Sequence, residues 1–187
     1  MNKKQITVTF ILAVLMVSLI LVQRFFNDRF ANIAITNQNM GKLDEYYLMN
    51  GKYSYQLPES WSVEEVVSSG TNIFRVDFKD STNNIIGNIQ IIDNKKDDIN
   101  TIAETDINNM ILERDQEEVE NIKYGDKKGI KVKYKAKVNN GYTYINSSYY
   151  ISMEENEKIK VAFIVKEDNY NDNMTSVFDI IVRSINK

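Results

Sequence analysis

The chain contains no cysteine and no histidine in its 187 residues. The lack of cysteine excludes disulfide bonds, cysteine nucleophiles, thiolate metal sites and a lipid-modified N-terminal cysteine. The lack of histidine excludes histidine-based triads and histidine metal ligands. The stretch "DNYNDN" at 168–173 does not follow the pattern of a calcium loop, since Tyr170 takes its third position and no glycine follows. We interpret the acidic stretch "MEENE" at 153–157 as a solvated hairpin turn. The sequence predicts no metal site and no cofactor.

The chain also lacks a net positive charge and recognisable catalytic motifs. The net charge is −3, whereas a general nucleic-acid binder is usually basic, so we expect no nucleic-acid partner. There is no P-loop and no GxGxxG motif, and Ser, Thr and Lys residues stand in no catalytic pattern. Hydrophobic residues make up 43% of the chain, enough for one folded domain plus an anchor. We predict that the protein is not an enzyme.

An apolar run dominates the N-terminus. Residues 6–22 carry no charge, and their number is the lower limit for a helix that spans a bilayer. A cleaved signal peptide would have small residues after this run, but the bulky and charged "VQRFFNDRF" follows. We therefore predict an uncleaved transmembrane signal anchor at residues 6–23, after a cytoplasmic tail at 1–5. Lys3 and Lys4 favour a single-pass protein of the cell membrane with a cytoplasmic N-terminus and an extracytoplasmic C-terminal domain.

The segment after the anchor has a broken helical spacing of apolar residues. It ends at the turn "MNGK". We interpret residues 24–50 as a juxtamembrane stalk helix, with a helix that binds a partner as the alternative. The extracytoplasmic domain then covers residues 51–187.

Within this domain the hydrophobic periodicity predicts the order βββαβββα, an α+β class. Three strands are expected in "KYSYQLPESW", "TNIFRVDFKD" and "IIGNIQIID". Apolar residues then recur at helical spacing through residues 97–122. Strands are expected next in "GIKVKYKAKV", in the segment after Gly141 and in "KIKVAFIVKE", before an amphipathic helix that starts near Tyr170.

The stretch "GIKVKYKAKV", residues 129–138, alternates almost without a fault. One face carries apolar side chains, and the other carries the lysine row, which we define as Lys131, Lys133, Lys135 and Lys137. Asn140-Gly141 is typical of a two-residue type I′ hairpin. Such a hairpin would place Val132 opposite Tyr149 and Lys133 opposite Ser148. Both strands then agree on which face is polar, which supports this register.

Two stretches near the ends of the domain carry a family resemblance. At the front stands "YSYQLPESW", with Tyr55, Pro58 and Trp61, and at the back "YYISMEENEKIKVAFIV" precedes a last helix that ends in "IIVRSI". Over about residues 52–186 the chain resembles the PsbP family and its bacterial PsbP-like relatives. The resemblance implies an antiparallel sheet, here of six strands, with helices packed on its faces, and binding or assembly modules without enzymatic activity. Plant members carry metal-linked histidines, which this chain lacks, so no metal site is carried over.

The lysine row raises the question of a binding surface. Polar outward residues are the default on a half-exposed sheet, and lysines also protect edge strands. The alternative is a basic, aromatic-bordered patch for an acidic protein partner or an anionic polymer of the envelope. Its residues would be Lys131, Lys133, Lys135, Lys137, Tyr144, Tyr150 and Lys160. The acidic run Asp115, Glu117, Glu118 and Glu120, expected on a helix, is a candidate internal counter-charge.

Two functions are consistent with these features. The first is a membrane-anchored extracytoplasmic binding or assembly module of PsbP-like type, without enzymatic activity. The alternative is an accessory subunit of a membrane secretion, conjugation or sporulation apparatus that works through its transmembrane helix and stalk. The expected partners are the membrane, through residues 6–23, and a protein or an anionic envelope polymer. Ligand identity and oligomeric state are left open.

Overall fold

The computed structural model describes Leu12, Leu15, Met16, Ser18 and residues 41–66, 72–92, 94, 96–110, 112–138, 141–153 and 157–187. The chain divides into two compact units, Met1–Met40 and Gly41–Lys187. The four described residues of the first unit are helical, and the Ser18 hydroxyl donates to the Leu15 carbonyl at 2.8 Å. No helix among the described residues has the length and apolar character needed to cross a membrane. Apart from those four residues, the expected anchor and the first part of the stalk lie outside the described residues.

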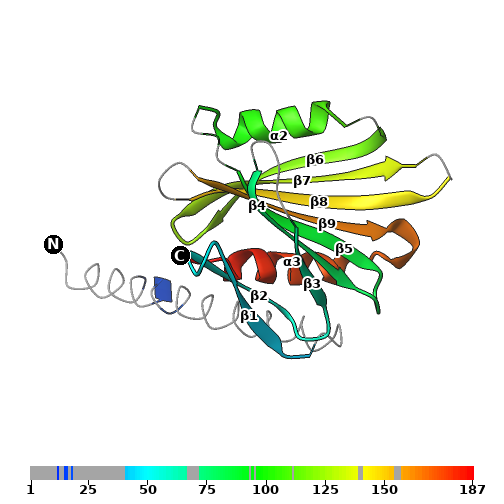
Figure 1. Cartoon of the computed structure of the whole chain (residues 1–187). Helices are drawn as coiled ribbons and strands as arrows, with labels where there is room; N and C mark the ends of the chain where they lie inside the picture. The colour runs from blue at the N-terminus through cyan, green and yellow to red at the C-terminus, as the bar shows by residue number, and fades with distance from the viewer. Residues whose placement is uncertain are drawn as a thin grey trace. The chain divides into compact units, whose positions relative to one another are not determined.

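The second unit contains the strands and helices labelled in Figure 1. The strands are β1 Leu43–Leu48, β2 Tyr53–Pro58, β3 Ser62–Val66, β4 Asn72–Asp80, β5 Ile85–Ile92, β6 Glu113–Tyr124, β7 Lys127–Lys137, β8 Thr143–Ser152 and β9 Lys158–Lys166. The helices are α2 Ile99–Asn108 and α3 Asp172–Ser184, and a short 3-10 helix, η2, spans Glu167–Asn169. β1 and β2 pair with each other, and the other strands form an antiparallel sheet in the order β3-β4-β5-β9-β8-β7-β6.

Helix α3 lies between the β1–β2 hairpin and the seven-stranded sheet (Figure 1). On the hairpin side, the Gln56 backbone N–H donates to the Ser184 hydroxyl at 2.9 Å. On the sheet side, the Phe178 ring stacks on Phe163 with ring centres 4.1 Å apart. Helix α2 packs on the opposite face of the sheet, over β7 and β8. The sheet therefore has a different helix on each face.

Local sequence explains why both helices form and which side each buries. Asp98 caps α2 by accepting a hydrogen bond from the Thr101 backbone N–H at 2.8 Å, and this bond lowers the pKa of Asp98. In both helices the apolar residues recur every three or four positions, which gives each one buried stripe. The buried residues are Ile102, Ala103 and Ile107 in α2, and Met174, Val177, Phe178, Ile181 and Val182 in α3.

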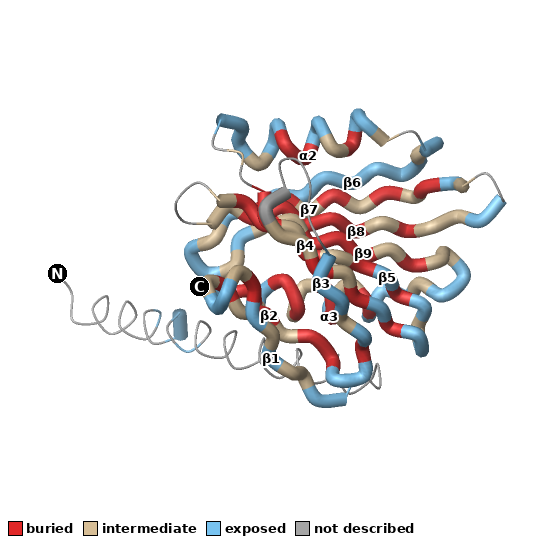
Figure 2. The backbone as a smooth tube through the Cα atoms, in the orientation of Figure 1, coloured by how far each residue is buried: buried red, intermediate tan, exposed pale blue. Residues whose placement is uncertain are grey.

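The alternation in β4 and β5 sets the face that α3 covers. Val76 and Phe78 of β4 are buried, as are Ile85, Ile89 and Ile91 of β5, which confirms these residues as inward. Figure 2 shows buried stretches along the strands of the main sheet. Gly87 stands in the same row of β5, where a Cβ atom would come within 2.3 Å of the Phe78 ring and 2.4 Å of the Ala162 carbonyl. Glycine is needed here because the ring occupies the space of a side chain.

Trp61 joins this core, as expected. Its side chain is 4% exposed and stacks on Phe78 with ring centres 5.5 Å apart. Stacked aromatic pairs of this kind add stability beyond the area they bury. The tryptophan therefore has a packing role.

The helix expected over residues 97–122 is wrong beyond Asn108. Residues Glu113–Tyr124 form strand β6, which pairs along its length with β7. Glutamate favours helices over strands, so local propensity misleads here. The pairing with β7 places carboxylates opposite lysines, and this tertiary contact overrides the local preference.

The N-terminal boundary and the strand number also differ from expectation. The stalk helix expected for residues 24–50 is wrong at its end, because Leu43–Leu48 forms β1 and stacks Tyr46 on the Tyr55 ring of β2. The compact unit begins at Gly41 rather than at residue 51. The main sheet has seven strands rather than six: β3 and β6 are added, and β2 leaves it to pair with β1.

Candidate functional site: the lysine row and the acidic edge strand

The lysine row lies on the face of the sheet that carries α3, not on an open face. The hairpin pairs Lys137 with Thr143, Lys135 with Ile145 and Lys131 with Tyr149. The expected register is therefore wrong by one residue, and a one-residue slip moves a strand's side chains to the other face. Val132 and Tyr134 are buried as expected, but beside Ser148 and Asn146 under α2.

The turn explains this slip. The Val138 N–H donates to the Tyr142 carbonyl at 3.0 Å, which leaves three residues between them rather than two. Gly141 has φ +83°, a left-handed conformation that glycine adopts without strain. Three-residue hairpin loops commonly carry a glycine in this conformation. The Asn-Gly pair thus predicted a hairpin correctly but not the length of its loop.

Three of the four lysines have partners from η2, α3 or the segment between them. Lys135 Nζ lies 2.6 Å from a Glu167 carboxylate oxygen, and Lys131 Nζ lies 3.6 Å from Asp179. Lys133 Nζ lies over the Tyr170 ring, 4.9 Å from its centre. Lys137 is exposed at the end of the strand. The ammonium groups therefore hold η2 and α3 against the sheet instead of forming one free basic surface.

Asp179 is the centre of this contact. Its Oδ1 accepts hydrogen bonds from the hydroxyls of Tyr149 at 2.8 Å and Tyr124 at 3.2 Å, and Lys131 lies on the same oxygen. Burial, and then the nearby carboxylate, raise the pKa of both tyrosines. Both hydroxyls therefore stay protonated and donate at neutral pH.

A column of acids flanks the lysine row on its other side. We call Glu113, Asp115, Glu118 and Glu120 of β6 the acidic column. They lie directly opposite Lys137, Lys135, Lys133 and Lys131, respectively. Three members of the run considered as counter-charge, Asp115, Glu118 and Glu120, therefore lie opposite lysines of the row, but on a strand rather than on the expected helix. Among the residues that the structure describes, no ion pair joins the column to the row.

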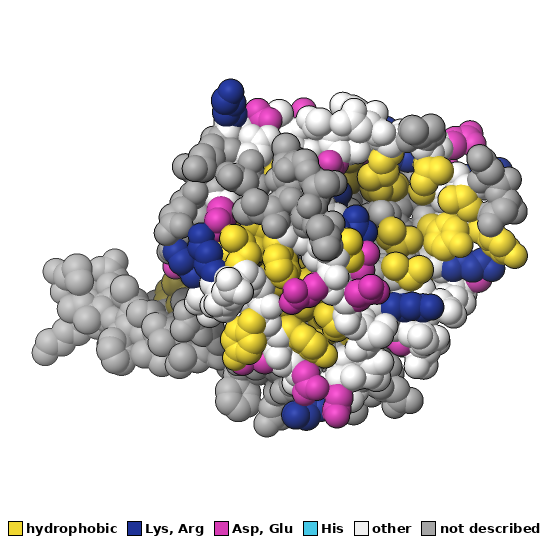
Figure 3. Space-filling model, in the orientation of Figure 1, with side chains coloured by type: hydrophobic (Ala, Val, Ile, Leu, Met, Phe, Trp, Pro, Cys, Tyr) yellow, Lys and Arg dark blue, Asp and Glu magenta, His cyan; other side chains and the backbone are white. Residues whose placement is uncertain are grey.

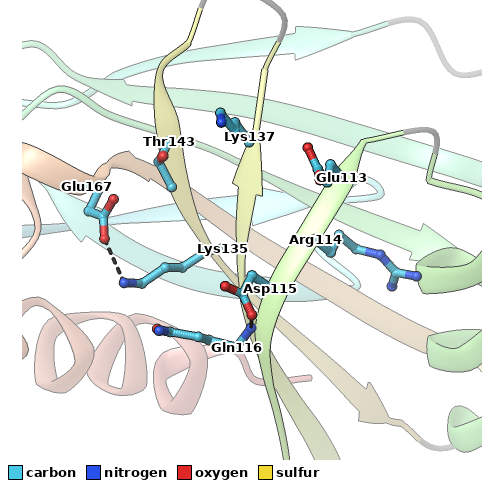
Figure 4. Close-up of a pocket in the computed structure, with 8 residues that line it drawn as sticks. All are labelled: Glu113, Arg114, Asp115, Gln116, Lys135, Lys137, Thr143 and Glu167. Carbon is cyan, nitrogen blue, oxygen red and sulfur yellow. Dashed lines mark hydrogen bonds and ion pairs between the residues drawn. The ribbon is translucent and has the colours of Figure 1, made fainter.

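A hollow of about 440 Å³ opens where the two columns meet at the end of the strands (Figure 4). Lys135 extends toward Glu167, whereas Arg114 extends away from Lys135. The hollow is lined by Glu113, Arg114, Asp115, Gln116, Lys135, Lys137, Thr143 and Glu167. Charges of both signs alternate around it, so this site suits polar contacts with a partner.

The other three predicted site residues lie on the α2 face of the sheet. Lys160 Nζ donates to Asp106 of α2 at 2.7 Å, and the Tyr150 hydroxyl donates to the same carboxylate at 3.1 Å. Burial, followed by the nearby Asp106 carboxylate, raises the pKa of Tyr150. Tyr144 is half-buried farther along this face. The structure therefore brings Tyr150 and Lys160 together but separates them from the lysine row.

Charge on the visible surface is mixed rather than segregated. In Figure 3, basic and acidic side chains lie near one another with hydrophobic side chains between them. In the described part of the chain, no three carboxylates gather in a way that could hold a metal ion. Sequence reasoning missed Asp106 and Asp179 as partners of the tyrosines and lysines, because nothing local marks them.

Comparisons with known proteins identify the fold. The solution structure of cyanobacterial PsbP (CyanoP) from Synechocystis sp. PCC 6803 matches with a TM-score of 0.52 at 16% identity, over 78% of this chain and 92% of that chain. LpqN, a Mycobacterium tuberculosis protein involved in cell envelope biogenesis, matches with a TM-score of 0.49 at 10% identity, over 78% of this chain and 91% of that one. No protein-family model and no curated protein sequence matches the chain. The chain has a PsbP-like fold, which confirms the resemblance found in its sequence.

Proposed function

We propose that the chain is a membrane-anchored extracytoplasmic binding or assembly module without enzymatic activity. The observation that carries this proposal is the PsbP-like fold of residues 41–187. The family resemblance implies modules that attach to larger complexes. A fold alone does not fix a function, so binding has to be measured directly.

The geometry favours a protein partner over an anionic envelope polymer. An anionic polymer needs free cations, but Lys131 and Lys135 are paired with carboxylates and Lys133 lies over a tyrosine ring. Lys137 is the member of the row that is exposed. A protein partner could use the edge strand β6, which has twelve residues, most of them polar and exposed.

The binding proposal is tested by cross-linking intact cells that carry the full chain. We expect the chain to appear in a larger species that persists when the anchor is exchanged and disappears when residues 41–187 are replaced by an unrelated domain. A chain that stays monomeric under all cross-linking conditions would contradict the proposal.

The anchor is part of the same proposal. The support for it is the uncharged run at residues 6–22 and the bulky, charged sequence after it. We expect the full chain to stay with membranes through high-salt and carbonate washes, and external protease to remove residues 41–187 from cells stripped of their wall. Mature soluble protein that begins after residue 23 would contradict the anchor.

The alternative function, an accessory subunit of a secretion, conjugation or sporulation apparatus, places the activity in the N-terminal part. The feature that favours it is the N-terminal sequence, in which the uncharged run at residues 6–22 is followed by a segment with broken helical spacing of apolar residues. Exchange of residues 1–40 for an unrelated single-pass anchor separates the two functions. If the chain keeps its function in the cell after the exchange, the result supports the binding module. If that function is lost, the result supports the accessory subunit.

A further inference from the structure

Strand β6 is a long exposed edge of the main sheet. It is the last strand in the sheet order, and among the described strands it pairs only with β7. Nine of its twelve residues are exposed, and Figure 2 shows the exposed colour along most of its length. The outer side of an edge strand presents unpaired backbone N–H and C=O groups, which can pair with another extended chain.

The side chains of β6 make this edge acidic. The strand holds five carboxylates against Arg114 and Lys123. The lysines of β7 are opposite the acidic column in register, but Lys131 and Lys135 form their ion pairs with Asp179 and Glu167 on the other side. Glu118 and Glu120 are exposed, and no ammonium group in the described part of the chain forms an ion pair with them.

The regular part of this edge is short and well defined. The β6–β7 register shifts between Asp115 and Glu118, and Gln116 between them has φ +52°. A bulge of this kind bends the strand and interrupts pairing. Residues 118–124 continue without a further shift, and Val119 among them is 63% exposed. This stretch has the geometry to accept one more strand.

We propose that residues 118–124 of β6 bind an extended, lysine- or arginine-rich segment of a partner protein, which adds to the sheet as an eighth strand. The proposal rests on the binding function proposed above and names its surface. A second copy of this chain does not supply the cations that Glu118 and Glu120 call for, because the centred antiparallel pairing of residues 118–124 with their own copy sets Glu118 opposite Tyr124 and Glu120 opposite Ile122. An anionic lipid surface does not fit, because its negative charge would repel the carboxylates.

The inner neighbour of β6 shows what such a segment looks like. Strand β7 places Lys133 and Lys131 opposite Glu118 and Glu120, with Val132 opposite Val119. A partner with the same alternation of a cation and an aliphatic residue would face the carboxylates with its cations and cover Val119 with its apolar side chain. Charge complementarity and apolar contact together favour a segment in which cations alternate with apolar residues over a segment that carries cations without this alternation.

A synthetic peptide with the sequence of residues 129–138, "GIKVKYKAKV", is the direct probe. We expect it to bind the full chain in detergent solution, with fluorescence anisotropy as the measurement and with affinity that falls steeply as salt rises. The double substitution Glu118→Lys and Glu120→Lys should weaken binding by about tenfold or more, because two cross-strand attractions become repulsions. Hydrogen exchange should show new protection in β6 and unchanged protection in β7.

Matched controls separate the proposal from simple charge attraction. Glu64→Lys with Glu65→Lys makes the same change of charge on exposed positions of β3, the opposite edge strand, and should leave binding unchanged. The peptide "KKKKGIVYAV" has the same composition without the alternation and should bind at least about tenfold more weakly. Equal binding of both peptides, equal loss in both double variants, or no binding would overturn the proposal. Glu118→Gln with Glu120→Gln serves as a second variant if the reversed one fails to fold.

Failure here is distinguishable from failure of the proposed function. A cross-linked complex in cells that survives Glu118→Lys with Glu120→Lys would show a binding module that uses another surface. Loss of the complex in this variant, with the β3 variant intact, would support both proposals together.

Discussion

The two faces of β7 have opposite chemistry, and a different helix meets each one. On one face Ile130, Val132 and Tyr134 are buried under α2 in an apolar cluster. On the other face the lysine row meets acidic and aromatic groups of η2, α3 and the segment between them. A single strand is thus held by burial of apolar area on one side and by charge pairing on the other.

The apolar contact of β7 with α2 and its charged contact with η2 and α3 depend on different physical quantities. Apolar packing is non-directional and scales with the area removed from water. Ion pairs depend on distance and exposure, and half-exposed pairs contribute little. We therefore expect the α2 side of β7 to dominate stability and the lysine side to fix where α3 and η2 lie.

The largest expected effect comes from a charge on the apolar face. Val132→Asp should lower the free energy of unfolding by roughly 3–5 kcal/mol, because Val132 is fully buried and the carboxylate would have no partner. Its neighbour across the strands, Val119, is exposed, and Val119→Asp should change stability by only about 0.5 kcal/mol. Urea unfolding of both variants measures the difference, and equal effects would show that Val132 is not buried under α2.

The next-largest loss of stability is expected at Asp179, the centre of the contact between the lysine row and α3. Asp179→Ala should cost roughly 1–3 kcal/mol, because the buried Tyr149 hydroxyl loses its acceptor. Glu167→Ala removes the Lys135 pair, which is partly exposed, and should cost about 0.2–1 kcal/mol. Thermal unfolding of the two variants compares them directly. A larger loss in Glu167→Ala would mean that the outer pair, not Asp179, holds this face.

Alkaline pH should weaken the apolar face through Tyr134. Burial raises the pKa of Tyr134 to about 12 from 10.0, so above pH 10 the folded chain binds more protons than the unfolded chain. The stabilising contribution of Tyr134 is complete below pH 10 and is lost as pH rises toward 12. At pH 11 the loss amounts to about 1 kcal/mol. Urea unfolding at pH 8 and pH 11 measures the loss from all the buried tyrosines together, since the pKa values of Tyr55, Tyr124, Tyr149 and Tyr150 are raised as well. Tyr134→Phe, which cannot ionise, should reduce it, and an unchanged pH dependence would exclude Tyr134 as the cause.

The smallest effect separates the two ends of the lysine row. The Lys131 side chain is 12% exposed beside Asp179, so Lys131→Gln should cost about 0.5–1 kcal/mol. Lys137 is exposed at the strand end, and Lys137→Gln should stay within about 0.5 kcal/mol. High salt should shrink the difference, because it screens the ion pair. Equal effects in low salt would indicate that the row acts as a solvated face throughout.

Strong periodicity made several elements predictable. Alternation placed β4, β5, β7 and β9, and the amphipathic stripe placed α3. These patterns are local, because each element must bury its own apolar face. The expectation for β6 failed because its charged residues show no strand alternation and favour a helix, whereas hairpin pairing with β7 makes this segment a strand.

The candidate site was less predictable than the fold. Its lysines alternate with apolar residues along β7 as expected, but the residues that share their face depended on one residue in the β7–β8 loop. Because side chains alternate with a period of two, that residue changed which side chains of β8 share a face with the lysine row. The row therefore lies on the α3 face. Their partners Asp179 and Glu167 come from segments distant in the sequence, so no local pattern reveals them.

By itself, the sequence determined which residues are apolar on β7, that β7 and β8 form a hairpin, and that no cysteine or histidine chemistry is available. Composition and short-range spacing carry this information, since they act within one element. Only the tertiary structure decided that β6 is an edge strand, that the lysines turn toward α3, and that the acidic column remains exposed. These outcomes depend on register and on contacts between distant segments, where the energy of one cross-strand or helix–sheet contact outweighs the preference of either segment alone.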